Sequence, residues 1–230
     1  MPKAHRTALA CFGLVWALSW VGEPWPAEKA LHDSLTVVGL AALYWAWRRY
    51  RLPLSSWVLV LVFLSLHEVA AHWLYSYVPY DEWTDKLFGF RLTEVFGWHR
   101  NHFDRLVHFT YGVCATGVLT RFLLDHTGRS LRSAVFRAVE IVLGTSALYE
   151  LFEWGVASLF APGVAEAYNG QQGDMWDPHK DITMAVLGAV VAGVFLVLRK
   201  ASGRVVVSGS AGSIEGKETV ASRRVSKSPE

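Results

Sequence analysis

Long apolar segments separated by short polar connections run through the first 200 residues of the chain. Six of them predict helices, at about 7–22, 31–47, 54–75, 104–124, 134–160 and 181–198. Several are long enough to cross the hydrocarbon core of a bilayer, which takes about 20 residues of helix. The pattern therefore predicts an all-α fold, a polytopic membrane bundle of about six transmembrane helices within residues 1–200.

Composition favours a membrane protein over a water-soluble domain. Hydrophobic residues make up 52% of the chain, charged residues only 18%, and the mean hydropathy is +0.25. The net charge of +2 and the lack of a basic run interleaved with aromatics argue against a nucleic-acid partner. Cys11 and Cys114 both lie in apolar segments, so we expect two buried thiols and no disulfide framework.

The charges of the connections predict the orientation of the bundle. Alternate connections are basic, and those between them are acidic. The basic residues are Lys3, Arg6, Arg48, Arg49, Arg51, Arg121, Arg129, Arg132, Arg137, Arg199, Lys200 and Arg204. Because Lys and Arg are retained on the cytoplasmic side, both termini are expected in the cytoplasm.

Four segments outside this pattern have their own interpretation. Lys3 ahead of an apolar run also fits a signal peptide, but no small-x-small cleavage site precedes Pro24, so we expect a retained span. Residues 76–100 mix aromatics and charges, which predicts a short interfacial or re-entrant element. The glycine-containing stretch 169–174 predicts a tight turn, either closing over a site or simply connecting two helices. The tail 201–230 lacks aromatics and is expected to be a disordered cytoplasmic extension.

Histidines and carboxylates gather in the outer part of four predicted helices. These residues are His67, Glu68, His72, His102, Asp104, His108, Glu150, Glu153, Asp174, Asp177 and Asp181. Ionisable groups inside a membrane cost a few kcal/mol each and persist where they face partners or water. We therefore expect them to share one pocket near the external surface. The inner halves of the same helices are nearly free of ionisable residues.

The spacing and type of these residues predict a metal site. Pairs such as Glu68/His72 and Asp104/His108 are four residues apart and share a helix face. Bundle cores build metal sites from such pairs on facing helices, and a mixed imidazole and carboxylate set suits Zn, Mn or Fe. The candidate ligands are His67, Glu68, His72, His102, Asp104, His108, Asp174, Asp177 and Asp181; the candidate catalytic groups are Glu150, Glu153 and Arg105.

Each candidate also has a structural interpretation that stays open. His67 fits a core histidine bonded to a neighbouring helix, and Glu68 fits the partner that fixes a histidine tautomer. Asp104 and Asp177 fit the acids favoured at helix N-termini. The carboxylates of the fifth segment fit ion pairs with Arg105. A metal-free polar cavity that handles protons is a further alternative.

Several blocks of these polar residues resemble a known family. Residues 101–109 are similar to the N-H-x-D-R-x-x-H-F signature of the YjdF-like bacterial inner-membrane proteins, and residues 67–72, 149–154 and 170–181 fit as well. The resemblance spans residues 31–199 and includes the polar residues named above. It implies a multi-pass protein of the bacterial cytoplasmic (inner) membrane and supplies a fold rather than a reaction.

Three functions are compatible with these observations. The first is a metal-dependent enzyme acting on a lipid or envelope-precursor substrate, with His72, Asp104, His108 and Asp181 as first ligands. In it, a carboxylate of the fifth segment is a ligand or general base, and Arg105 contacts an anionic substrate group. The second is a cation or proton transporter, and the third is a non-catalytic structural component of the membrane. No HExxH, GxSxG or P-loop pattern selects a reaction.

Overall fold

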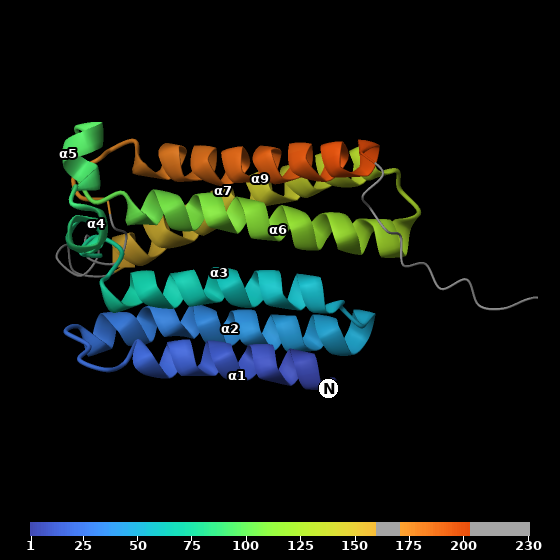
Figure 1. The fold of residues 1–230 in the computed structure, drawn as a ribbon, viewed down its shortest axis with the longest axis horizontal. Helices are drawn as coiled ribbons and strands as arrows, with labels where there is room; N and C mark the ends of the chain where they lie inside the picture. Colours follow the sequence, from blue (N-terminus) through green and yellow to red (C-terminus); the bar gives the residue numbers. More distant parts are fainter. Residues whose placement is uncertain (160–170, 203–230) are drawn as a thin grey trace, which may run out of the picture.

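The computed structural model describes residues 1–159 and 171–202, which form eight helices and no strand. Six long helices run side by side as a bundle (Figure 1). They are α1 (Lys3–Leu18), α2 (Pro26–Tyr50), α3 (Leu54–His72), α6 (Phe103–Thr127), α7 (Leu131–Leu159) and α9 (Asp177–Ala201). Two short helices, α4 (Tyr80–Phe88) and α5 (Leu92–Phe96), lie together at one end, called here the α4 end. The predicted all-α fold is confirmed.

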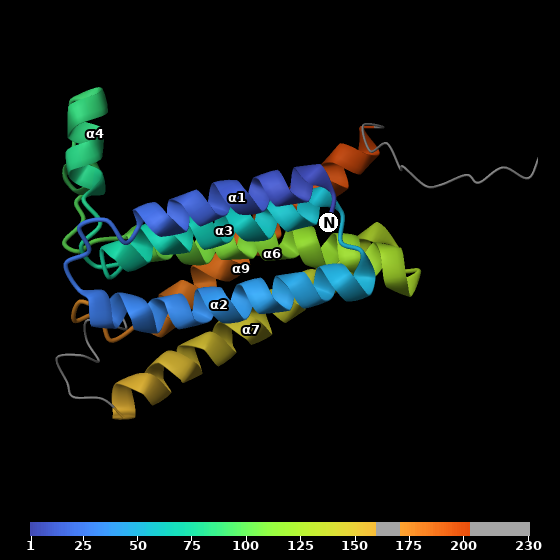
Figure 2. The ribbon, with the colours of Figure 1, turned by 90° about the horizontal axis from the view of Figure 1, so that it is seen from below.

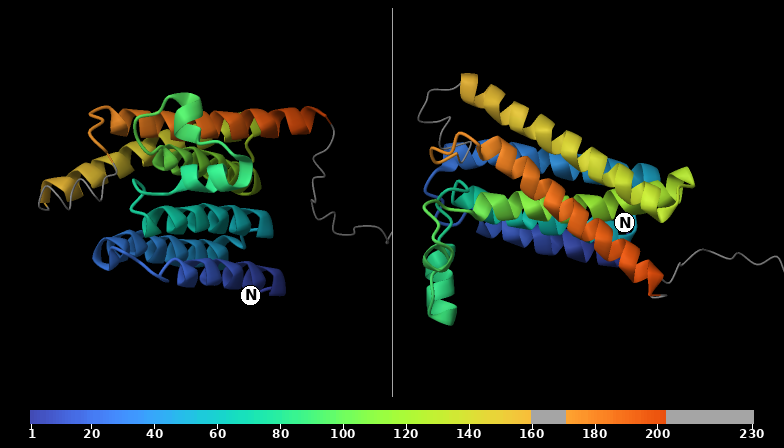
Figure 3. Two further views of the ribbon diagram at one scale, coloured as in Figure 1. Left: turned by 60° about the vertical axis from the view of Figure 1, so that its left-hand side comes forward. Right: turned by 90° about the horizontal axis from the view of Figure 1, so that it is seen from above.

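The long helices form two groups of three. In the first group α3 packs against α1 and α2, and in the second α6 packs against α7 and α9. The contact between α3 and α6 joins the two groups, and α9 crosses α6 obliquely (Figure 3). A space between the groups is therefore bounded by helices from both halves of the chain.

Glycines set the close approach of α6 and α9. A Cβ atom at Gly112 would lie 1.9 Å from the backbone oxygen of Ala185, and one at Gly188 would lie 2.1 Å from that of Phe109. Small residues allow helices in a membrane to approach backbone to backbone, where van der Waals packing replaces the hydrophobic driving force. Asp181 lies one turn before Ala185 on the same face of α9. The packing thus brings the polar end of α9 against α6.

An aromatic and aliphatic core holds the first group together. It contains Phe12, Leu43, Trp47, Leu52, Trp57, Leu61 and Leu64. Cys11 precedes the inward-pointing Phe12 by one residue, or about 100° around the helix, and it is exposed on the outside of α1. The expectation of two buried thiols is therefore wrong for Cys11 and right for Cys114.

The predicted element in residues 76–100 is a pair of short helices. Helix α4 runs across the bundle axis rather than along it (Figure 2). Both helices end at glycines in the left-handed region, Gly89 at φ 74° and Gly97 at φ 63°, which L side chains rarely adopt. Leu87 and Phe88 are exposed on α4. The interfacial position of this element remains a prediction.

The bounds of the long helices differ from the expected ones by a few residues. Helix α2 begins earlier, because Pro26 is well placed at the first helical position. Helix α3 ends earlier, because Leu74 and Tyr75 adopt positive φ. Among the helices of the described residues, α3, α6 and α9 are long and apolar enough to cross a membrane. The full count of six spans therefore stays a prediction.

Both ends of the described chain lie at the end of the bundle opposite α4 (Figure 1). The α2–α3 and α6–α7 connections lie there as well. This arrangement agrees with termini on one side of a membrane, while their cytoplasmic location stays a prediction. Parts of three predicted segments lie outside the described residues. These parts are residue 160 of the fifth helix, Asn169 and Gly170 of the predicted turn, and the tail from 203 onward.

Candidate functional site

Three candidate ligands converge between α6 and α9 near the α4 end. One ligand atom each from Asp104, His108 and Asp181 lies within 4.8 Å of the others. His108 Nε2 lies 3.6 Å from Asp104 Oδ1 and 3.9 Å from Asp181 Oδ1. Ligands about 2.1 Å from a tetrahedral metal lie roughly 3.4 Å apart, so small side-chain movements would close this group around one ion. Three protein ligands leave a fourth position for substrate or water.

The local sequence explains this convergence. Asp104 and His108 are one turn apart and face α9, and Gly112 continues the same face one turn further along. On α9, Asp181 precedes the small Ala185 that contacts Gly112. Asp104 and Asp181 are almost completely buried, with 5% and 3% of their surface exposed.

Two arginines hold the surrounding aspartates. Arg100 Nη2 lies 3.2 Å from Asp104 Oδ2, which leaves Oδ1 directed at His108. Arg105 forms ion pairs with Asp177 and Asp181, and its Nη1 donates a hydrogen bond to the Asp177 carbonyl at 3.2 Å. These contacts fasten the start of α9 to α6. The predicted contact of Arg105 with an anionic substrate remains a prediction.

Helix α7 supplies two further carboxylates. Glu150 Oε1 lies 3.8 Å from His108 Nε2, is buried, and accepts no hydrogen bond from the described residues. Glu153 lies one turn further along α7 and lines a cavity that Asp104 and His108 also line. An unpartnered buried carboxylate oxygen is costly, so Glu150 is suited to a cation or a proton.

The cluster carries more acids than bases. Its carboxyl groups are Asp104, Glu150, Glu153, Asp174, Asp177 and Asp181, and its permanent cations are Arg100, Arg105 and Lys180. Such an excess of buried negative charge requires protons or a bound cation as compensation. This is the electrostatic reason to consider a metal ion here.

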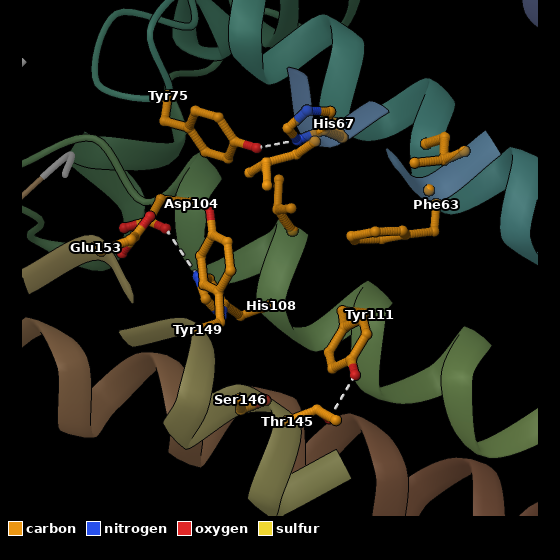
Figure 4. A pocket seen from close by; sticks show the side chains of 14 residues that line it. Phe63, His67, Tyr75, Asp104, His108, Tyr111, Thr145, Ser146, Tyr149 and Glu153 are labelled. Carbon is orange, nitrogen blue, oxygen red and sulfur yellow. Dashed lines mark hydrogen bonds and ion pairs between the residues drawn. The ribbon is translucent and has the colours of Figure 1, made fainter. Parts of the chain in front are cut away.

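An apolar cavity of about 270 Å³ leads away from the cluster. Figure 4 shows Asp104, Glu153 and His108 at one end of it and Phe63 and Tyr111 at the other. Its lining residues are Leu35, Gly39, Phe63, Leu64, His67, Tyr75, Asp104, Val107, His108, Tyr111, Thr145, Ser146, Tyr149 and Glu153. They come from α2, α3, α6, α7 and the residues after α3, so both halves of the bundle contribute.

A second cavity of about 380 Å³ lies between α7 and the start of α9. Glu150, Glu153, Asp177 and His179 are among its lining residues. Glu153 lines both cavities. Glu153 therefore lies at the border between the two cavities.

A separate polar network joins α1, α2 and α3. The carboxylate of Glu68 accepts hydrogen bonds from Lys29 Nζ at 2.9 Å, Thr36 at 2.6 Å and Ser19 at 3.1 Å. Lys29 also donates to Asp33 Oδ1 at 2.7 Å. Lys29 and Glu68 are both 0% exposed. The expectation of one shared pocket is therefore wrong for Glu68, whose observed partners belong to the first group of helices.

The three remaining histidines have partners of their own. His72 Nδ1 donates to the Ser19 carbonyl at 2.7 Å and lies 3.0 Å from Glu23. His67 forms a hydrogen bond with Tyr75 and lines the apolar cavity, so it faces the same space as Asp104 from α3. His102 precedes α6 and stacks on Trp98 at 4.4 Å, and burial lowers its pKa. Their metal-binding roles stay predictions.

Asp174 lies outside the spans and is held by a surface cation. Lys180 Nζ donates to its Oδ2 at 2.6 Å, and this hydrogen bond lowers the pKa of Asp174. Arg100 and Arg105 lie 3.5 and 3.4 Å from the same oxygen. Asp174 thus helps to anchor the turn before α9.

The sequence interpretation missed the partners of Glu68. The expected helix at 31–47 excludes Lys29, although Lys29 lies four residues before Asp33 and shares its helix face. Trp16 and Trp20 donate indole hydrogen bonds to Asp33 Oδ2 at 2.7 and 2.8 Å. Nothing in the sequence alone pairs Trp16 of α1 and Trp20 of the following turn with an acid on α2.

Comparison with known proteins places the chain among membrane proteins. Residues 4–202 match the model of a family described as "Predicted membrane protein (DUF2238)". The chain belongs to this family. It is also 32% identical over 176 residues to the inner membrane protein YjdF of Escherichia coli (strain K12), covering 72% of this chain and 79% of that protein. No solved structure matches the chain.

These findings confirm two predictions. The resemblance to YjdF-like proteins holds over most of the chain, and the location in a bacterial inner membrane agrees with the relative and with the three apolar helices. The chain is thus a member of a membrane-protein family. Its structure contains a cluster of Asp104, His108 and Asp181.

Proposed function

We propose that this protein is a membrane-embedded, metal-dependent enzyme acting on a lipid or envelope-precursor substrate. The observation that carries the proposal is the convergence of Asp104, His108 and Asp181 within 4.8 Å beside an apolar cavity. One nitrogen and two oxygen ligands suit Zn, Mn or Fe, and Glu150 Oε1 is a further unpartnered donor nearby. The residues present therefore fit a divalent metal.

The membrane arrangement that goes with this proposal has six spans and cytoplasmic termini. Helices α2 and α7 contain 25 and 29 residues, or about 37 and 43 Å at 1.5 Å per residue, and they lie alongside the three apolar helices. The charges that interrupt α2, Lys29 and Asp33, are paired inside the bundle. The basic residues near the opposite end support an external position for the cluster.

Each residue of the cluster has a defined task in this proposal. A divalent metal held here would supply a Lewis acid for a phosphoryl or carbonyl oxygen of the substrate. Asp104 and His108 of α6 and Asp181 of α9 would hold it, while Arg100 and Arg105 orient the two aspartates. Glu150 and Glu153 accept or return a proton at the border between the two cavities.

Metal analysis of the purified full-length protein tests the proposal. The wild type, prepared without chelator, is expected to retain about one equivalent of a divalent transition metal. The His108→Ala and Asp181→Ala variants are expected to lose most of this metal. His126→Ala and Asp125→Ala are matched controls, because both residues lie near the exposed far end of the same helix α6 and should leave the metal content unchanged.

The proposal fails if the wild type and both site variants contain the same negligible amount of metal after reconstitution with Zn, Mn and Fe in turn. It also fails if the site variants retain the wild-type amount while remaining folded. Circular dichroism of each sample shows whether the helices are intact.

A second function is favoured by one observation. Arg105 of α6 forms ion pairs with Asp177 and Asp181 of α9. If the cluster has only a structural role, these ion pairs serve to hold α6 and α9 together. In this alternative the protein is a non-catalytic membrane component, and a chelator leaves its melting temperature unchanged while Asp181→Ala lowers it. A metal-dependent enzyme predicts that the chelator lowers the melting temperature of the wild type only. The cation or proton transporter stays a prediction, to be tested by ion flux in proteoliposomes.

A further inference from the structure

The apolar cavity is bounded by helices of both groups. Leu35 and Gly39 of α2 form one side of it, and Thr145 and Tyr149 of α7 form the other. Among the described helices, α2 packs on α3, and α7 packs on α6 and α9. Helices α2 and α7 therefore lie on opposite sides of the cavity, and its lining includes the exposed Thr145 of α7.

From this geometry we infer that the cavity binds one hydrocarbon chain of a membrane lipid, which enters from the bilayer between α2 and α7 and brings its polar head to Asp104 and His108. The inference names the substrate class and the entry route for the proposed function and rests on it. It commits to a lipid chain as the occupant.

The mouth of the cavity is continuous with the surface that faces lipid. Thr145 lines the cavity and is exposed, and Val38 and Leu148 are exposed on α2 and α7. In a bilayer the medium next to these residues is hydrocarbon, so a lipid chain reaches the cavity without crossing water.

The interior suits a chain with a polar end. Phe63, Leu64 and Val107 line it with hydrocarbon, and the carboxylates Asp104 and Glu153 lie together at one end of it. Along α6 the lining runs from Asp104 to Tyr111, a rise of about 10 Å. Its volume of about 270 Å³ exceeds the roughly 150 Å³ of an engineered apolar cavity that holds benzene. A segment of one chain fits this space, whereas a whole two-chain lipid does not.

A glycine keeps the space open. A Cβ atom at Gly39 would lie 3.4 Å from Leu64 Cδ2, so a larger side chain would extend into the cavity with modest adjustment. Gly144 on α7 provides the matched control, because a Cβ atom there would meet nothing within 4 Å. Both positions are helical glycines, so the loss of flexibility is the same.

Photocrosslinking in a defined membrane tests the inference. The full-length protein is placed in phosphatidylcholine nanodiscs containing phosphatidic acid with a diazirine on one acyl chain, and adducts are mapped by mass spectrometry. We expect adducts on the cavity walls at Phe63 and Val107. Gly39→Leu should lower their yield at least fivefold, and Gly144→Leu should leave it unchanged.

A second variant protects the test against misfolding. Ser146→Leu fills the cavity from α7 and should also lower the yield of wall adducts. Wild-type adducts confined to outward-facing residues such as Val37 and Leu148 would overturn the inference, and so would an unchanged wall yield in folded Gly39→Leu and Ser146→Leu. Metal content measured on the same samples is independent: metal without wall adducts removes this inference alone, and wall adducts without metal remove the proposed enzyme alone.

Discussion

Replacing Lys29 with methionine tests how the first three helices are held together. Lys29 is completely buried and lies 2.7 Å from Asp33 and 2.9 Å from Glu68. Methionine has a similar length but no charge, so the variant leaves two buried carboxylates without their cation. Lys29 also lies 5.0 Å from the centre of the Trp20 ring, a contact that is lost as well.

The expected cost is large for a single substitution. Removing one partner of a buried ion pair typically costs about 3–5 kcal/mol, since the remaining charge stays buried. At about 1.4 kcal/mol per tenfold change, Lys29→Met should lower the folding equilibrium constant by roughly 100- to 4000-fold. Lys180→Met is the matched control, because its Lys180–Asp174 pair is on the surface, with the lysine side chain 54% exposed, and should cost about 1 kcal/mol or less.

A double variant separates the charge effect from packing. Glu68→Gln keeps the acceptor for Ser19 and Thr36 but removes one buried charge. Lys29→Met combined with Glu68→Gln should therefore cost less than the sum of the two single changes, by about 1–3 kcal/mol. The assay is unfolding of the detergent-solubilised protein by increasing dodecyl sulfate, followed by circular dichroism. The reasoning is refuted if Lys29→Met costs no more than Lys180→Met, or if the two changes are simply additive.

Two further predictions concern α9 and the turn before it. Gly188→Leu should separate α9 from α6, lowering both the melting temperature and the metal content, because its Cβ would lie 2.1 Å from the Phe109 oxygen; Gly144→Leu should change neither, and an unaltered Gly188→Leu protein would contradict the packing argument. The stabilising effect of Lys180 should depend on pH, because its hydrogen bond lowers the pKa of Asp174. Since the folded pKa lies below the unfolded one, this stabilisation is complete above the ordinary aspartate pKa of about 3.9 and is lost as the pH falls through the lower folded value. Melting temperatures of wild type and Lys180→Met should thus differ at pH 6 and converge in strong acid; a difference that grows in acid would contradict the assignment.

The helices of this fold could be predicted because they depend on local patterns. The lengths of the apolar segments, the prolines and the polar connections can be read directly from the sequence. The observed helix bounds differ from the expected ones by a few residues. The ends of α3 and α2 were the less predictable parts. The reversal at Leu74 and Tyr75 requires positive φ at non-glycine residues, which no sequence rule indicated.

The candidate site could be predicted only in part, for a physical reason. Sequence order and hydropathy give the depth of a residue along the membrane normal, but not which helices are neighbours. Asp104, His108 and Asp181 have similar depth and lie on helices that pack together through glycines, so the expected proximity is observed. Glu68 has a similar expected depth, but it faces α1 and α2, where Lys29 neutralises it. Lateral arrangement, set by packing, decides between these outcomes.

X-ray absorption at the metal edge tests the central claim most directly. The full-length protein is loaded with zinc, and the spectra of wild type and His108→Ala are compared. The account predicts a first shell of nitrogen and oxygen at about 2.0–2.2 Å, with the scattering of one imidazole that disappears in His108→Ala. A sulfur shell near 2.3 Å, or an imidazole signal that persists without His108, would contradict it.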